Sequence, residues 1–155
     1  MPGVLTHSPA DIIAQVLVDL GLVQPWNESK LPKDQVSWAV SSGKDVDKPD
    51  KAVMIKDTQG RDQLRVLWGQ RSEMQGFQVM VRAPKRSEAF LLAQQIAIAL
   101  DTTVTGATPT LDGVQYHVQS VDRSSQVLPL GTERAQSARE LFTINAVVTL
   151  FQLGS

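Results

Sequence analysis

The sequence predicts an α+β fold, in which two main helices pack on a mostly antiparallel sheet. Apolar residues recur at helical spacing in two segments and alternate at strand spacing in several others. The predicted order is one helix, three or four strands, a second helix and two more strands, with no repeat and no regular βαβ alternation. Because 155 residues suit one hydrophobic core, we expect a single domain over residues 1–155.

The first helix is expected over residues 9–20. Its start, "SPAD", provides a hydroxyl at Ser8 for the cap, a proline where no N–H donor is needed, and a carboxylate at Asp11 where the helix dipole favours negative charge. The apolar stripe that follows consists of Ile12, Ile13, Val16, Leu17 and Leu20. Gly21 can then end the helix in a left-handed conformation.

A short strand and a hairpin are expected next. Residues 36–40 alternate in polarity as a strand with one buried face does, whereas "SSGKDVDKPDK" at 41–51 has little to bury and predicts a mobile loop. The segments "KAVMIKD" (51–57) and "QLRVLWGQ" (63–70) flank "TQGR". They predict two strands joined by a turn at Gly60.

A further strand and the second helix follow. Residues 77–82 alternate, and Ala83-Pro84 is expected to end that strand. Ser87 is expected to cap a helix whose core stripe consists of Ala89, Leu92, Ala93, Ile96 and Leu100. Phe90, Leu91 and Ile98 lie outside that stripe. Because the helix is apolar nearly all round, it must be buried on more than one side, by its own domain or by a neighbouring subunit.

Two strands are expected in the last third of the chain, over residues 114–123 and 140–152. A breaker-rich link (102–113) precedes them, and "SSQVLPLGTERAQSA" (124–138) separates them. The second of these strands has an unbroken apolar face, made of Phe142, Ile144, Ala146, Val148 and Leu150. That face predicts a central or long edge strand over the core.

Composition excludes several kinds of chemistry. With no cysteine there is no thiolate nucleophile and no disulfide, and the net charge of −1 gives no overall attraction to nucleic acid or anionic lipid. The two histidines, His7 and His117, fall in different predicted elements, so no metal site is expected. No phosphate-binding or dinucleotide-binding glycine pattern occurs, and no segment is apolar enough to span a bilayer. We therefore expect no catalytic residue and no cofactor, and synthesis in the cytoplasm.

The stretch "VMVRAPKRSEAF" (79–90) leaves two readings open. Arg82, Lys85 and Arg86 beside a helix start could hold a phosphate through free amides and positive charge. Alternatively, these side chains are solvated or paired with nearby carboxylates such as Glu88.

Two longer segments resemble a known family, the tail terminator proteins of long-tailed bacteriophages, which include minor capsid or head-tail joining proteins. In "FQVMVRAPKRSEAFLLAQQIAIALD", as in that family, a strand ending in arginine leads to a helix with Glu-Ala near its start. The matching positions are Val79, Val81, Arg82, Glu88, Ala89 and Leu100. "SSQVLPLGTERAQSARELFTINAVVTLFQ" resembles the family's Pro-Leu-Gly loop, basic residue and final strand, at Pro129, Leu130, Gly131, Arg139 and Asn145. The two segments cover about a third of the chain. Ser137-Ala138 stands where members often have a glycine before the basic residue, a departure that bears on the conformation of the loop.

The resemblance implies a non-enzymatic structural protein of the virion, at the head-proximal end of the tail. Six copies would form a ring that caps the tail tube, ends its polymerisation and provides the interface for head attachment. The implied partners are other copies of the chain, the major tail tube protein and a head-completion or connector protein, with DNA passing through the lumen without specific binding and no membrane involved. The interaction candidates are Arg82, Lys85, Arg86, Glu88, Gly131, Arg134 and Arg139. Two alternatives remain: a small α+β enzyme or anion-binding protein that uses the basic strand-helix joint, and another tail-tube or head-completion subunit.

Overall fold

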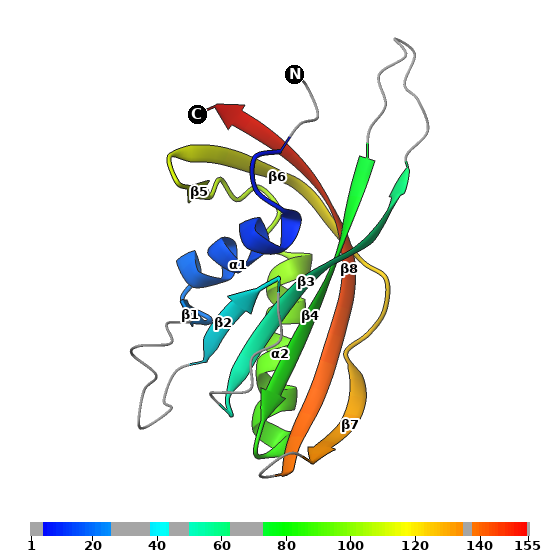
Figure 1. Ribbon diagram of the computed structural model, residues 1–155. Coiled ribbons are helices and arrows are strands. Elements are labelled where there is room, and N and C mark those ends of the chain that lie inside the picture. Colours follow the sequence, from blue (N-terminus) through cyan, green and yellow to red (C-terminus); the bar gives the residue numbers. More distant parts are fainter. Residues whose placement is uncertain (1–4, 26–37, 44–49, 63–72, 135–137, 155) are drawn as a thin grey trace.

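The computed structural model describes residues 5–25, 38–43, 50–62, 73–134 and 138–154, which form two α-helices and one eight-stranded sheet (Figure 1). The elements are α1 (Pro9–Asp19), β1 (Gln24–Pro25), β2 (Ala39–Ser42), β3 (Ala52–Asp62), β4 (Glu73–Ala83), α2 (Arg86–Asp101), β5 (Thr110–Leu111), β6 (Val114–Arg123), β7 (Leu128–Arg134) and β8 (Ala138–Gly154).

The sheet is mixed. Its strands follow the order β1-β2-β3-β4-β8-β6-β5, and β7 also pairs with β8. The pairings of β2 with β1 and with β3 are parallel, whereas the remaining pairings of the described strands are antiparallel. The predicted α+β class is thus confirmed, with a parallel portion at one edge that the prediction did not include.

The last strand was predicted to be either a central strand or a long edge strand. β8 lies between β4 and β6, so it is a central strand. β4 pairs with residues 140–148 along one edge of β8, and β6 followed by β7 pairs along the other. The predicted apolar face of β8 is buried. This placement explains the unbroken apolar face, because the strand crosses the middle of the core.

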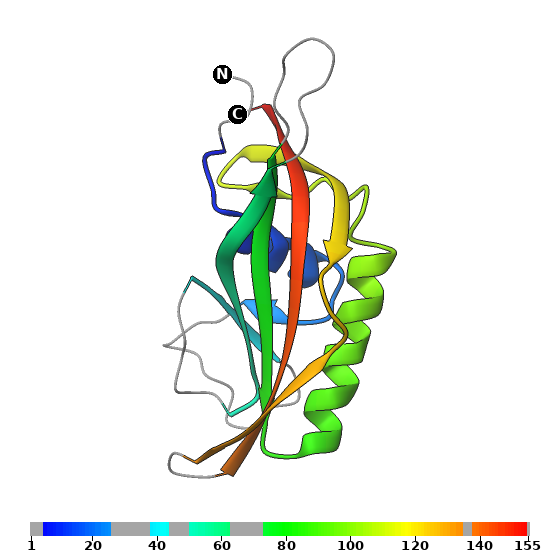
Figure 2. The ribbon, with the colours of Figure 1, turned by 90° about the vertical axis from the view of Figure 1, so that its right-hand side faces the viewer.

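Both helices cover the same face of the sheet. Buried residues of α1 and α2 join Val53, Val79, Ile144 and others in one cluster. Figure 2 shows α1 behind the sheet and α2 along its right-hand side. The predicted first helix is confirmed to within one residue: the Ser8 hydroxyl accepts a hydrogen bond from the Asp11 amide at 3.4 Å, and Gly21 has φ +75°.

The predicted turn at Gly60 is wrong. β3 continues to Asp62 and pairs directly with β4, from Ala52 opposite Arg82 to Asp62 opposite Glu73. Gly60 lies instead at an irregular step in this ladder, between Thr58 and Arg61. The close approach occurs at Gly76 of β4, where an added Cβ would lie 2.5 Å from the Gln59 carbonyl oxygen. The predicted strand at 63–70 lies outside the described residues.

The predicted loop at 41–51 begins too early. Ser41 and Ser42 belong to β2 and pair with Met54 and Ile55, and Ser41 is buried. A pair of serines can continue a strand when its neighbour supplies the backbone partners. Residues 44–49 lie outside the described part of the chain, as do residues 36 and 37 of the strand predicted before this loop.

The second helix starts one residue before the predicted cap. Lys85 is the N-cap residue and makes no side-chain capping bond, so Ser87 lies inside the first turn and the predicted cap is wrong. The Ala89 amide donates to the Lys85 carbonyl oxygen at 3.2 Å, which begins the helical ladder. The predicted core stripe is buried, whereas Phe90, Leu91 and Ile98 are 40%, 57% and 63% exposed.

Three strands were not predicted, and the first of them, β1 (Gln24–Pro25), lies in the supposed connection after the first helix and pairs in parallel with β2. β5 lies in the supposed link at 102–113 and forms a hairpin with β6 through Asp112 and Gly113, both at positive φ. β7 lies in the supposed connection at 124–138. Pro129 argues against a strand, but an irregular step between Pro129 and Gly131 accommodates it at the side of β8.

Candidate functional site

The basic joint between β4 and α2 is the first part of the candidate site. Arg82 of this joint and a second interaction candidate, Arg139 on β8, are each only 2% exposed in the single chain. Both meet Asp50: the Arg82 Nε donates to its backbone carbonyl oxygen at 3.5 Å, and the Arg139 Nη1 lies 3.5 Å from its carboxylate. These two guanidinium groups therefore tie the end of the sheet to the start of β3.

Arg86, in contrast, lies at the surface. Its guanidinium lies over the ring of Phe142 at 5.1 Å from the ring centroid, and its Nη1 is 3.9 Å from a carboxylate oxygen of Glu140. Glu140 also accepts a hydrogen bond from the Thr132 hydroxyl at 3.0 Å. Arg86 is thus the end of a chain of contacts that links α2 to β8 and β7, and its side chain is still 61% exposed.

Glu88 belongs to a separate contact. Its carboxylate lies 3.3 Å from the Lys51 ammonium, which also lies 5.8 Å from the centroid of the Trp38 ring. This partly exposed pair joins the first turn of α2 to the residue before β3. Trp38 itself is half-buried and packs against the core, so it offers no platform for stacked bases.

The predicted cations do not converge on one point. Arg82 and Arg139 are directed to Asp50 and Arg86 to Glu140, and Lys85 is exposed at the helix start. An anion cradle needs several donors aimed at one place, so this arrangement gives the phosphate reading little support.

The remaining two candidates lie on β7. Gly131 has φ +91° with open space where a Cβ would be, beside the irregular step in the β7–β8 ladder. Arg134 ends β7 opposite Ala138, and its side chain lies outside the described part of the structure. β7 therefore belongs to the same end of the molecule as the basic joint, linked to it through Thr132 and Glu140.

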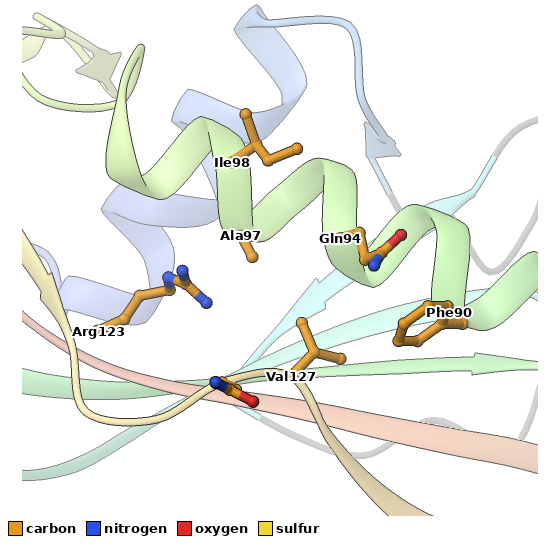
Figure 3. A pocket seen from close by; sticks show the side chains of 7 residues that line it. Phe90, Gln94, Ala97, Ile98, Arg123 and Val127 are labelled. Atoms are coloured by element: carbon orange, nitrogen blue, oxygen red, sulfur yellow. The ribbon is translucent and has the colours of Figure 1, made fainter.

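A groove beside α2 is the second part of the site, and it was not predicted. It has a volume of about 300 Å³ and lies between one side of α2 and the segment that joins β6 to β7 (Figure 3). Phe90, Gln94, Ala97 and Ile98 line it from the helix, and Arg123, Gln126 and Val127 line it from the opposite side. The helical pattern predicted that Phe90 and Ile98 lie outside the core stripe, but the opposite wall belongs to a segment that was interpreted as a connection.

Among the described residues that line this groove, Arg123 is the only charged one, and it is already paired. Arg123 donates two hydrogen bonds to the carboxylate of Asp101, at 2.8 and 2.7 Å. The hydrogen bond to Asp101 and its negative charge raise the pKa of Arg123, against the opposing effect of burial. The described lining of the groove therefore offers apolar surface and two amide side chains, and it contains no unpaired charge.

A cluster around His7 was also missed. The Nδ1 atom of His7 lies 2.6 Å from the Tyr116 hydroxyl and its Nε2 lies 3.0 Å from the Asp112 carboxylate, while its backbone N–H donates to the same hydroxyl at 3.0 Å. This carboxylate, imidazole and hydroxyl series resembles a catalytic relay in composition. Tyr116 is completely buried, however, so its oxygen cannot meet a substrate. The cluster fastens the segment before α1 to the β5–β6 hairpin.

Within the described residues, no group of three or more histidine, cysteine, aspartate or glutamate side chains could hold a metal ion. Nor is either described helix long and apolar enough to cross a membrane. Comparison of the chain with protein-family models and with curated proteins found no match.

Proposed function

We propose that this protein is a tail-terminator-like subunit of a bacteriophage virion, which assembles into a ring at the head-proximal end of the tail tube. In this role it performs no catalysis. The ring ends polymerisation of the tube and provides the surface to which the head attaches, and DNA passes through its lumen without specific binding.

The outer face of α2, formed by Phe90, Leu91, Gln94, Gln95 and Ile98, is the observation that carries this proposal. All five side chains are exposed in the single chain, and no charged residue occurs between Glu88 and Asp101. A soluble monomer rarely leaves such a surface uncovered, so burial against another protein is the reading that physical chemistry favours. Two segments resemble tail terminators, one containing this helix and one containing β7 and β8. This resemblance is the reason for proposing a ring on the tail tube as the kind of assembly.

The basic joint supports assembly better than anion binding. Arg82 and Arg139 serve the subunit's own structure, which leaves Lys85 and Arg86 as the joint's accessible cations among the described side chains. They stand at the end of the apolar outer face, where a charge at the rim of an interface sets register and partner choice.

The proposal is tested by electron microscopy of particles made without this protein. We expect overlong tails that are not joined to heads, and rescue of both defects when the wild-type chain is supplied. Tails of normal length that are joined to heads would rule out the terminator role.

A second measurement addresses the ring itself. Six copies of a 16.9 kDa chain have a mass of about 101 kDa, which mass photometry separates readily from the monomer. Arg86→Glu should leave the melting temperature of the monomer nearly unchanged, because exposed charges contribute within about 0.5 kcal/mol. It should weaken ring formation if the cation faces a complementary surface, and unchanged assembly and head joining would show that Arg86 makes no contact between subunits.

A further inference from the structure

We propose that the groove beside α2 receives the C-terminal end of β8, residues 150–154, from a second copy of the chain. This inference rests on the proposed function, because it names the two surfaces that meet at the contact between neighbouring subunits. It assigns Phe151 and Leu153 as the side chains that enter the groove.

The exposed apolar side chains fall into two main groups. Of the eight large apolar side chains exposed in the described residues, five lie on α2 and β7, and two, Phe151 and Leu153, lie at the end of β8. The remaining one is Leu20, just after α1. The end of β8 is therefore the one other place in the described chain where two such side chains occur together.

Among the described residues, one backbone edge at the end of β8 has no partner strand. β6 pairs with it as far as Gly154, but pairing with β4 stops at Val148 in the described residues. Phe151 and Leu153 are 47% and 55% exposed and, two residues apart on a strand, point to the same side. An exposed apolar strand edge invites pairing with another chain unless something covers it.

Within the described residues, neither of the two surfaces carries an unpaired charge. No charged residue occurs between Glu140 and Gly154, and the cation in the groove wall, Arg123, is held by Asp101. An acidic peptide or a nucleic acid would find no unpaired cation in this groove, and a charged segment would lose its hydration there without a partner. An uncharged strand with two apolar side chains avoids both penalties, and Gln94 and Gln126 can bond to its backbone.

A subunit cannot fill its own groove in this way. The groove lies beside the middle of β8, because the Phe90 ring is 5.4 Å from that of Phe142 and Arg123 pairs with Ala146. Phe151 is five residues beyond Ala146, or about 17 Å along the strand. It also points to the opposite face of the sheet from Phe142 and Ala146, which face the helices.

The contact therefore joins two different surfaces on two copies. Such a head-to-tail contact repeats from copy to copy until it closes into a ring, or continues as a filament if the rotation does not close. Little ordering is needed at the end of β8, since the side-chain carbonyl of Gln152 already accepts hydrogen bonds from the Thr6 amide and hydroxyl, at 2.9 and 3.1 Å.

Disulfide cross-linking tests the pairing directly, because the natural chain has no cysteine. Ile98→Cys and Phe151→Cys are prepared separately, mixed and oxidised mildly at a concentration at which the wild type self-associates. We expect a covalent dimer of about 34 kDa from the mixture, and little from either variant alone. Leu20→Cys mixed with Phe151→Cys is the matched control, since Leu20 is also a surface-exposed apolar residue but lies outside the groove.

Dimers from Ile98→Cys alone would show that α2 packs against α2 and would overturn the inference. So would a yield no higher than the Leu20 control, or a wild type that remains monomeric at every concentration. A non-covalent check is Ile98→Glu, which should weaken self-association at least about tenfold while the monomer's melting temperature stays unchanged.

The double variant Ile98→Cys/Phe151→Cys separates this inference from the proposed function. A covalent ladder that ends at six supports both. A ladder that continues past six supports the pairing but contradicts a closed ring of six. If virions lacking this protein show the tail defects but the cross-link fails, the function stands and the pairing falls.

Discussion

Replacing Ile96 by alanine and, in a second variant, Ile98 by alanine separates folding from assembly on a single helix. The Ile96 side chain is completely buried in the core, whereas Ile98, two residues later, is 63% exposed. Losing a buried isoleucine in favour of alanine costs about 2–5 kcal/mol, because apolar burial is lost and a cavity remains. Alanine has the better helix propensity, which offsets only about 0.4 kcal/mol of this loss in the free energy of unfolding.

The expected shifts in melting temperature differ accordingly. For a chain of this length each kcal/mol corresponds to about 2–4 °C, so a net loss of about 1.6–4.6 kcal/mol in Ile96→Ala should lower the melting temperature by about 3–18 °C. Ile98→Ala should change the free energy of unfolding by no more than about 0.5 kcal/mol, and in the stabilising direction if helix propensity decides. Self-association should weaken for Ile98→Ala, which removes a side chain from the outer face of α2.

The assay is urea unfolding followed by circular dichroism, at a dilution at which sedimentation shows only monomer. Calorimetry at the same dilution gives the melting temperatures. If both variants lose the same stability, then the outer face of α2 is packed within the monomer, and the argument for a second burial surface fails.

Three other substitutions test single contacts. Gly76→Ala should cost about 1–3 kcal/mol, because the new Cβ would lie 2.5 Å from a backbone carbonyl oxygen of β3, and denaturant unfolding measures the loss; wild-type stability would mean that the two strands separate there freely. Arg123→Gln removes the bidentate pair with Asp101 and should cost at most about 1 kcal/mol, since Asp101 is partly exposed, with the loss shrinking in high salt. Tyr116→Phe should lower the free energy of unfolding by about 1–3 kcal/mol, because the imidazole and the backbone N–H of His7 lose their shared partner. Amide hydrogen exchange in residues 5–8 should become faster. Unchanged exchange would show that the hydroxyl does not hold this segment.

Much of the fold could be predicted where one local signal agrees with the tertiary environment. The start of α1 combines a hydroxyl cap, a proline and a carboxylate, and β8 has an apolar face over its whole predicted length, so both were found almost at their observed bounds. The strand at 114–123 was predicted with the observed bounds for the same reason.

The errors arose where a partner strand decided the structure. Gly60 has the local signature of a turn, but β4 pairs with β3 beyond it and absorbs the glycine into an irregular step. Pro129 has the local signature of a break, yet β8 supplies the other half of a ladder around it. Neither outcome can be read from the neighbouring residues, because the deciding hydrogen bonds come from distant parts of the chain.

Only one of the two walls of the groove in the candidate site, the one formed by α2, could be predicted from the sequence. Sequence periodicity places Phe90, Leu91 and Ile98 outside the core stripe, and the predicted second burial surface for them is not supplied by the described residues of the single chain, where all three are exposed. Burial of Arg82 was not expected, because alternation along β4 assigns it to the face away from the helices and gives no sign of what covers that face. The second wall of the groove depends on where the chain passes between β6 and β7, which is a tertiary fact.

The central position of β8 has a consequence for the synthesis of the protein on the ribosome. β8 is the last strand of the described chain, yet β4, β6 and β7 all pair with it. Until residues 138–154 have left the ribosome, β4 and β6 present unpaired edges, the β1–β4 and β5–β6 parts of the sheet are not connected, and β7 has no partner strand among the described residues. The nascent chain therefore cannot complete its core until residues 138–154 have emerged, and before then it depends on chaperones or on fast synthesis to avoid pairing with other chains.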